Sequence, residues 1–336
     1  VAAVPSLAGA RAYYDLPYRL LRPASVLIVG AGTGNDVAAA LRAEVARVDA
    51  VEIDPTIAAL GGRHPEQPNG DPRVRLIVND ARSHFRTSRD RYDLIVFGLL
   101  DSHRLLSYLS SVRMDSYVYT RESIAEAARL LSPTGVVALS FCVARPWLGE
   151  KIALTIRAVA GVDPLIVAAR DNSSTTFLFS PAPATMERLN GLPVPPEMTR
   201  AALAPAGGVE IATDDWPYFY MKGRGISNQY LATVLALLVL SLAMLFGAVP
   251  DLAPTAGRFF WLGAAFMLLE TRSITALSLL FGSTWAVNSL VIAAILAMIL
   301  LANLLIGLAD LKRVGGWYAL LFAALALGWL VPLSHP

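Results

Sequence analysis

The chain has 336 residues, of which 55% are hydrophobic and 16% are charged, and its formal net charge is +2. This composition is too apolar for one soluble domain of ordinary size, and the small net charge argues against a nucleic-acid partner. The single cysteine excludes an internal disulfide, and the four histidines lack the spacing of metal ligands, so no metal site is expected. Charged residues nearly vanish after Tyr230, which predicts a soluble domain followed by a membrane domain.

Residues 1–25 form a lead-in segment to the soluble domain. They begin at Val1 without methionine, and the opening VAAVPSLAGA lacks the basic region that starts a signal peptide. We therefore expect further sequence upstream of Val1.

Short apolar runs alternate with helical patterns between residues 26 and 182. The first run, VLIVG, shows no polar alternation, which fits a strand buried on both faces of a parallel sheet. Strands alternating with helices predict a doubly wound α/β sheet. The further predicted strands are VDAVEIDP, RVRLIVND, YDLIVFGLLD and VVALSFCV, followed by two strands within DPLIVAARDNSSTTFLFSP.

Residues 183–228 are predicted to be a connecting lobe, and residues 229–336 a transmembrane helical domain. The expected spans are 230–249, 285–309 and 317–333, with a further apolar stretch at 259–281.

The 259–281 stretch carries Glu270 and Arg272 in its middle, where burying charge is costly. Residues two apart do not share a helix face, so either each charge meets a separate partner or the helix breaks there. Basic residues near Lys222 and Lys312 are expected on the inner side of the membrane. A re-entrant 259–281 segment satisfies that expectation, whereas three full crossings do not.

A glycine cluster follows the first predicted strand. In GAGTGND, Gly30, Gly32 and Gly34 permit a tight turn and close approach of a ligand to the backbone. The helix that follows directs its free N–H groups toward that ligand. The spacing departs from the dinucleotide fingerprint, because Asn35 follows the third glycine where the fingerprint needs a glycine.

Acidic residues stand at the ends of the next three strands. Glu52 can accept both hydroxyl hydrogens of a ribose, Asp80 can accept from an adenine amino group, and Asp101 ends the fourth strand. The carboxyl ends of parallel strands meet at one edge, where open α/β sheets bind ligands. The alternative is that these acids cap the helices that follow them.

Together these motifs resemble the class I S-adenosylmethionine-binding fold and, within it, the spermidine synthase family. The pattern is most similar to bacterial membrane proteins in which a spermidine synthase-like domain is fused to transmembrane helices, and TDDWPYFY and FMLLETRSIT carry that part of the resemblance. The resemblance implies a Rossmann-like, seven-stranded sheet of the class I methyltransferase type. It also implies a homo-oligomer in the bacterial inner membrane, with the α/β domain in the cytoplasm.

The resemblance further implies that S-adenosylmethionine or its decarboxylated form binds at the glycine loop, and that an amine binds beside it. The cofactor-binding residues expected are Gly30, Gly32, Gly34, Asp36, Glu52 and Asp80. The substrate-binding residues expected are Tyr13, Tyr14 and Tyr117.

Two positions depart from the spermidine synthase pattern. Thr33 stands where the family has an acid, and Gly98 stands where the family has the aspartate that deprotonates the attacking amine. Glycine has no group that accepts a proton. Asp36, Asp101 and Asp115 are the candidate replacements, and we assign catalysis first to Asp101 and then to Asp115.

Three functions remain open at this point. The first is transfer of an aminopropyl or related alkyl group to an amine. The second is methyl transfer to a membrane-borne substrate, although Ile28 stands where many methyltransferases have an acid. The third, favoured by Gly98, is a non-catalytic nucleoside-sensing domain that regulates the membrane part.

Overall fold

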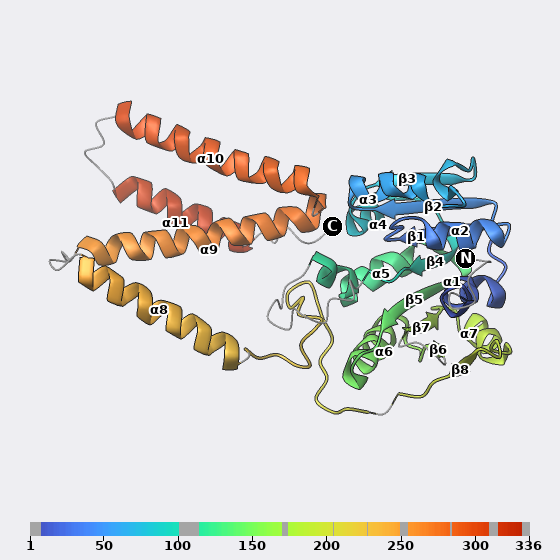
Figure 1. The fold of residues 1–336 in the computed structure, drawn as a ribbon. Coiled ribbons are helices and arrows are strands. Elements are labelled where there is room, and N and C mark those ends of the chain that lie inside the picture. Colours follow the sequence, from blue (N-terminus) through green and yellow to red (C-terminus); the bar gives the residue numbers. More distant parts are fainter. Residues whose placement is uncertain are drawn as a thin grey trace. The chain divides into compact units, whose positions relative to one another are not determined.

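A computed structural model describes residues 8–100, 114–169, 174–203, 205–226, 228–248, 255–282, 284–308 and 315–330. The chain forms two compact units, Val1–Thr233 and Val234–Pro336. The first unit contains the α/β fold, and the second consists of long apolar helices (Figure 1).

The first unit is built on an eight-stranded sheet with the order β3-β2-β1-β4-β5-β7-β6-β8 (Figure 1). Strands β3, β2, β1, β4 and β5 are parallel, and β7 lies antiparallel between β5 and β6. The strands are β1 (Ser25–Val29), β2 (Arg47–Glu52), β3 (Val74–Val78), β4 (Tyr92–Phe97), β5 (Leu131–Cys142), β6 (Leu165–Ala169), β7 (Ser174–Phe179) and β8 (Met198–Arg200).

The predicted fold class is confirmed, because this order is that of a methyltransferase-type, Rossmann-like sheet. The two strands expected within 163–181 are β6 and β7, and they form an antiparallel pair. The sheet has one strand more than the seven expected. The additional strand, β8, pairs with β6 at the sheet edge and comes from the segment that the sequence assigns to a connecting lobe.

Helices cover both faces of the sheet. The chain runs outward from β1 to β2 to β3 and then reverses toward β4 and β5. Because parallel crossovers are right-handed, this reversal puts the helices before and after it on opposite faces. The helices of this unit are α1 (Ala8–Leu20), α2 (Asn35–Arg42), α3 (Pro55–Leu60), α4 (Ala81–Thr87), α5 (Arg121–Arg129), α6 (Pro146–Ala160) and α7 (Pro183–Gly191).

The centre of the sheet is its most buried part. Residues Val26–Val29 of β1 are 0% exposed, as expected for a strand with neighbours on both sides and helices on both faces. This fixes the carboxyl end of β1, and therefore the glycine loop, on a rigid support. The reversal of strand order between β1 and β4 opens at the same edge, which is where ligands bind in such sheets.

The second unit and the segment leading into it are helical. The helices are α8 (Asn228–Ala248), α9 (Thr255–Phe281), α10 (Trp285–Leu308) and α11 (Gly315–Leu330). Three of them, α8, α9 and α10, are long and apolar enough to cross a membrane, and α11 is a shorter apolar helix. These three helices indicate membrane association.

Helix α9 continues through Glu270 and Arg272, so the alternative of a helix break at these charges is wrong. The helix ends at Phe281 and is followed by Gly282, whose φ of 98° is a left-handed conformation that suits glycine. Across the turn, Ser278 Oγ donates to Asn288 Oδ1 at 2.7 Å and ties α9 to α10. Whether 259–281 is re-entrant stays a prediction.

Candidate functional site

The glycine loop has the backbone that the sequence predicts. Gly30, Gly32 and Gly34 have φ values of 72°, 55° and 101°, which side-chain-bearing residues rarely adopt. The loop is anchored to the second strand, because the backbone N–H groups of Gly30 and Ala31 both donate to Val51 O at 2.9 Å. The result is a rigid turn at the carboxyl end of β1 that leads directly into α2.

Glu52 reaches from the end of β2 to this loop. Its Oε2 accepts from Gly32 N at 2.8 Å, its Oε1 accepts from Asp54 N at 3.0 Å, and the residue is 6% exposed. A carboxylate oxygen has more than one acceptor position, so these bonds leave capacity for hydroxyl donors. Glu52 therefore both fixes the loop and has the chemistry of a ribose ligand.

Asp80, at the end of β3, caps helix α4. Its Oδ1 accepts from Arg82 N at 2.7 Å and from Ser83 N at 3.3 Å. Asp54 does the same for α3, accepting from Thr56 N at 2.7 Å. The capping role considered from the sequence is thus present at Asp80, and its contact with adenine stays a prediction.

Asp36 lies in the first turn of α2 and points toward the end of β4. The residue is 8% exposed. A β-carbon at Gly98 would lie only 3.0 Å from Oδ2 of Asp36, so the carboxylate borders the position where the sequence lacks an acid. Burial raises the pKa of Asp36 to about 7, although a hydrogen bond from its own backbone amide acts in the opposite direction.

Tyrosines from α1 lie next to Asp36. Tyr13 packs edge-to-face on Tyr14, with ring centroids 4.9 Å apart. Burial, followed by the negative charge of Asp36, raises the pKa of Tyr14 and that of Tyr18, while a hydrogen bond with Asn35 lowers the pKa of Tyr14. The structure therefore brings the predicted Tyr14 to the predicted Asp36 and adds Tyr18, which the sequence did not single out.

The residues after β4 are only partly described. The Leu100 side chain lies against the glycine loop, and a β-carbon at Gly30 would lie 1.8 Å from its Cδ2. Asp101 lies outside the described residues. Asp115 belongs to the 3-10 helix η4 (Met114–Tyr119), and its side chain is also outside the description. The catalytic roles predicted for these two acids stay predictions.

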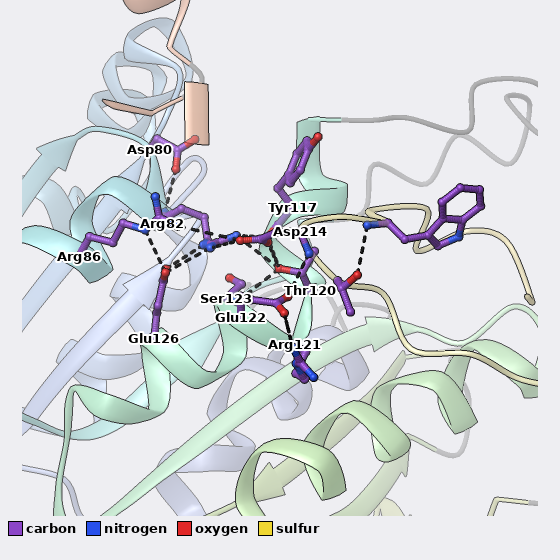
Figure 2. Close-up of polar contacts among 12 residues, drawn as sticks. Asp80, Arg82, Arg86, Tyr117, Thr120, Arg121, Glu122, Ser123, Glu126 and Asp214 are labelled. Atoms are coloured by element: carbon purple, nitrogen blue, oxygen red, sulfur yellow. Dashed lines mark hydrogen bonds and ion pairs between the residues drawn. The ribbon is translucent and has the colours of Figure 1, made fainter. Parts of the chain in front are cut away.

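A buried arginine joins α4, α5 and the segment before the membrane helices. Arg82, whose side chain is 3% exposed, donates to both carboxylate oxygens of Asp214, at 2.8 and 2.9 Å (Figure 2). Its Nε donates to Glu126 Oε2 at 2.9 Å, and its Nη1 donates to Tyr117 O at 3.0 Å. Thr120 Oγ1 donates to Asp214 Oδ1 at 2.7 Å. Every charge in this cluster has a partner.

Tyr117 belongs to this cluster and is half-buried. Burial, followed by the charge of Asp214, raises the pKa of its phenol. The structure thus brings Tyr117 to Arg82 and Asp214. A substrate contact of Tyr117 stays a prediction.

The sequence did not single out Arg82 or Asp214. Two signals were present: an arginine two residues after the helix-capping Asp80, and paired acids in the otherwise aromatic TDDWPYFY. Neither signal says which charge meets which, since the partners lie far apart in the chain. In the described ranges, no three His, Cys, Asp or Glu side chains gather as metal ligands.

No family model matches the chain. A polyamine aminopropyltransferase from Korarchaeum cryptofilum is 31% identical over 122 residues, which are 35% of this chain and 35% of that protein. The match thus spans about a third of the relative's length.

Solved structures are also similar. Spermidine synthase from Thermotoga maritima is 16% identical, with a TM-score of 0.42, and the alignment covers 65% of this chain and 72% of that one. Human methyltransferase-like protein 13, solved in complex with SAH, is 18% identical, with a TM-score of 0.40, and the alignment covers 60% and 95%. Together, the strand order and the 122-residue match show that the α/β unit has a spermidine synthase-like class I fold.

Proposed function

We propose that the chain is a membrane-anchored transferase that binds S-adenosylmethionine or its decarboxylated form and transfers an aminopropyl or related alkyl group to an amine. The observation that carries the proposal is the glycine loop with Glu52 bonded across it at the switch point of the sheet. The likeness of 122 residues to a polyamine aminopropyltransferase supports the choice of group.

In this reaction the protein need not form a covalent bond to the substrate. A sulfonium is already a good leaving group, so the site must align the nucleophile, the carbon and the sulfur and exclude water. An amine acceptor must lose a proton to attack, which requires a nearby carboxylate. In this proposal, the glycine loop, Glu52 and Asp80 hold the cofactor, while Tyr13, Tyr14 and Tyr117 contact the amine.

Methyl transfer to a membrane-borne substrate is the second candidate. The observation that favours it is the presence of three helices able to cross a membrane in the same chain. Such helices would hold the α/β unit at the surface where a membrane-borne acceptor lies. In either case we propose a bacterial inner-membrane location with the α/β unit in the cytoplasm.

Calorimetry on the full chain in detergent tests the cofactor. We expect S-adenosylmethionine, its decarboxylated form or methylthioadenosine to bind. Preference for the decarboxylated form supports aminopropyl transfer, and preference for S-adenosylmethionine supports methyl transfer. Binding of methylthioadenosine alone, without turnover, would instead support the nucleoside-sensing role, and absence of binding by all three would contradict the cofactor assignment.

Glu52→Ala tests the central observation. We expect at least tenfold weaker cofactor binding, because a charged hydrogen bond to the ribose and the clamp on Gly32 N are both lost. Glu66→Ala is the matched control, since this exposed glutamate contacts Arg42 on the surface. Unchanged affinity in Glu52→Ala would contradict the role of this carboxylate.

A further inference from the structure

The structure supplies an acid at the position where the sequence lacks one. We propose that Asp36, from the first turn of α2, is the general base that takes the proton from the attacking amine, and that its carboxylate occupies the place of a side chain at Gly98. The inference rests on the proposed function and names the residue that makes an amine acceptor reactive.

Gly98 is held at the switch point of the sheet. Its backbone N–H donates to Val29 O at 3.2 Å, which fixes the end of β4 against the end of β1. A β-carbon built there would point at Asp36 Oδ2, 3.0 Å away, and would lie 3.3 Å from Gly30 O. The carboxylate therefore lies directly beside the glycine loop that carries the cofactor in the proposed function. Glycine at position 98 leaves this space to Asp36.

Asp36 differs from the other buried acids of the described chain. Asp49 is paired with Arg75, Glu52 accepts from two backbone amides, and Asp80 accepts from two amides of its helix. Among the described residues, Asp36 has neither a cation nor an amide partner other than its own backbone N–H. Burying a carboxylate without compensation is costly, which points to a ligand that supplies the missing positive charge.

An ammonium group supplies that charge. Burial raises the pKa of Asp36 to about 7, and a general base is most effective when its pKa lies near the working pH. Tyr14 and Tyr18 face the same carboxylate, and their pKa values are raised, so both phenols stay protonated and do not compete as bases.

The proposed step balances as follows. The ammonium of the acceptor gives one proton to the Asp36 carboxylate, and the neutral nitrogen attacks the carbon next to the sulfonium. The new C–N bond forms as the C–S bond breaks, and the electron pair of that bond passes to sulfur, which leaves as a neutral thioether. The product nitrogen is protonated, and Asp36 returns its proton to solvent.

Asp36→Asn in the full chain tests this step, with decarboxylated S-adenosylmethionine, a series of diamines from 1,3-diaminopropane to 1,5-diaminopentane, and methylthioadenosine release as the assay. Loss of a general base lowers kcat by about 10²–10⁴-fold. In this inference Asp36 contacts the amine and not the cofactor, unlike the cofactor-binding role expected from the sequence, so cofactor affinity by calorimetry is expected to stay within about twofold. Asp15→Asn is the matched control, because Asp15 also lies near Tyr18 but is paired with Arg42 at 2.8 Å.

The double variant Asp36→Ala with Gly98→Asp tests the geometry. Removing the Asp36 carboxylate frees the space next to position 98. An acid introduced there is expected to raise the activity at least tenfold above that of Asp36→Ala alone. A structural role for Asp36 would not produce such a recovery. No recovery would overturn the shared-position argument.

The pH profile gives a third readout. Wild-type kcat/KM is expected to fall as the pH drops below about 7, because the base becomes protonated, and Asp36→Asn is expected to lose that dependence. Tyr14 and Tyr18 are the titratable groups of α1 that face Asp36, with the Asp15–Arg42 ion pair beyond Tyr18.

The outcomes separate the two proposals. A chain that binds none of the cofactors contradicts the proposed function. A chain that binds the decarboxylated cofactor and transfers its group equally well in wild type and Asp36→Asn contradicts only this inference. Cofactor binding without any amine-dependent release of methylthioadenosine contradicts both.

Discussion

The Arg82 cluster and the glycine loop are two regions of the α/β unit with acids that are at least partly buried. The acids of the cluster are paired with a cation, whereas the acid beside the loop has none among the described residues. In the Arg82 cluster, Asp214 and Glu126 both meet the buried guanidinium. Burial alone would raise the pKa of Asp214, but the hydrogen bonds and charge of Arg82 lower it overall. At the glycine loop, Asp36 is buried with no cation among the described residues, and its pKa rises to about 7.

The difference distinguishes buried charges that stabilise the fold from a buried charge that is available for chemistry. A buried pair whose hydrogen bonds are complete holds elements together, and removing one partner leaves an orphaned charge. A buried acid that lacks a partner weakens the fold, and such strain is characteristic of functional sites. The Arg82 cluster thus ties α4 and α5 to the segment before the membrane helices, while Asp36 is the acid for which we propose a ligand.

Arg82→Met removes the cation from the Arg82 cluster and so tests whether its charges stabilise the fold. The substitution keeps an unbranched apolar side chain but leaves Asp214 and Glu126 without their cation, so we expect a loss of about 3–5 kcal/mol in unfolding free energy. Chemical unfolding of the full chain, followed by tryptophan fluorescence, measures it.

Arg121→Met is the control for that variant. Arg121 pairs with Glu122 at the surface, with its side chain 52% exposed, so its loss is expected to cost at most about 1 kcal/mol. Adding Asp214→Asn to Arg82→Met is expected to recover part of the stability. Equal losses of unfolding free energy in Arg82→Met and Arg121→Met would mean that the Arg82 cluster does not stabilise the fold more than a surface ion pair does.

Asp36→Asn is expected to increase the unfolding free energy, whereas Arg82→Met is expected to decrease it. In the unfolded chain this carboxyl ionises near its ordinary pKa of 3.8, and in the folded chain near about 7. Ionisation therefore weakens the fold progressively as the pH rises from about 4 to 7, and the penalty is complete above that range. We expect the variant to be more stable than wild type at pH 8, by up to about 4 kcal/mol.

Urea unfolding at pH 8 and pH 4.5 measures this gain. It should shrink toward zero at the lower pH, because the folded wild type then holds its proton. A gain that is equal at both pH values would contradict the desolvated carboxylate. A loss of stability at pH 8 would mean that Asp36 has a partner that compensates its charge.

Gly34→Ala and Gly32→Ala compare two glycines of the loop, one closely packed and one facing open space. At Gly34, with φ of 101°, a β-carbon would lie 2.8 Å from Pro68 Cγ, so we expect a loss of about 1–3 kcal/mol. At Gly32, with φ of 55°, the nearest described atom would be 4.0 Å away, so strain alone is expected to cost about 1 kcal/mol.

A methyl group at position 32 would stand in open space on the loop that holds the cofactor in the proposed function, so we expect Gly32→Ala to weaken binding at least tenfold by calorimetry. Gly207→Ala is the control, because Gly207 has a φ of 63° with nothing within 4 Å. It should match Gly32→Ala in stability and leave cofactor affinity unchanged. Equal affinity in all three variants would place the ligand elsewhere.

Much of the fold followed from local pattern. The unbroken apolar run of β1, the glycine spacing after it and the strand–helix alternation predicted a doubly wound sheet, because buried parallel strands and tight turns impose these compositions. The eighth strand was missed, since three residues from Met198 to Arg200 are too few to show a period. Helix α9 was left open because composition alone does not say whether charges interrupt a helix.

For the site, the sequence determined which residues end the strands, and the shared edge of a parallel sheet then brings the glycine loop, Glu52 and Asp80 together. It also determined that Gly98 cannot accept a proton. Only the tertiary structure decided that Asp36 fills the space beside Gly98 and that Arg82 meets Asp214. Both are contacts between segments far apart in the chain, and such contacts depend on how side chains pack rather than on spacing along the sequence.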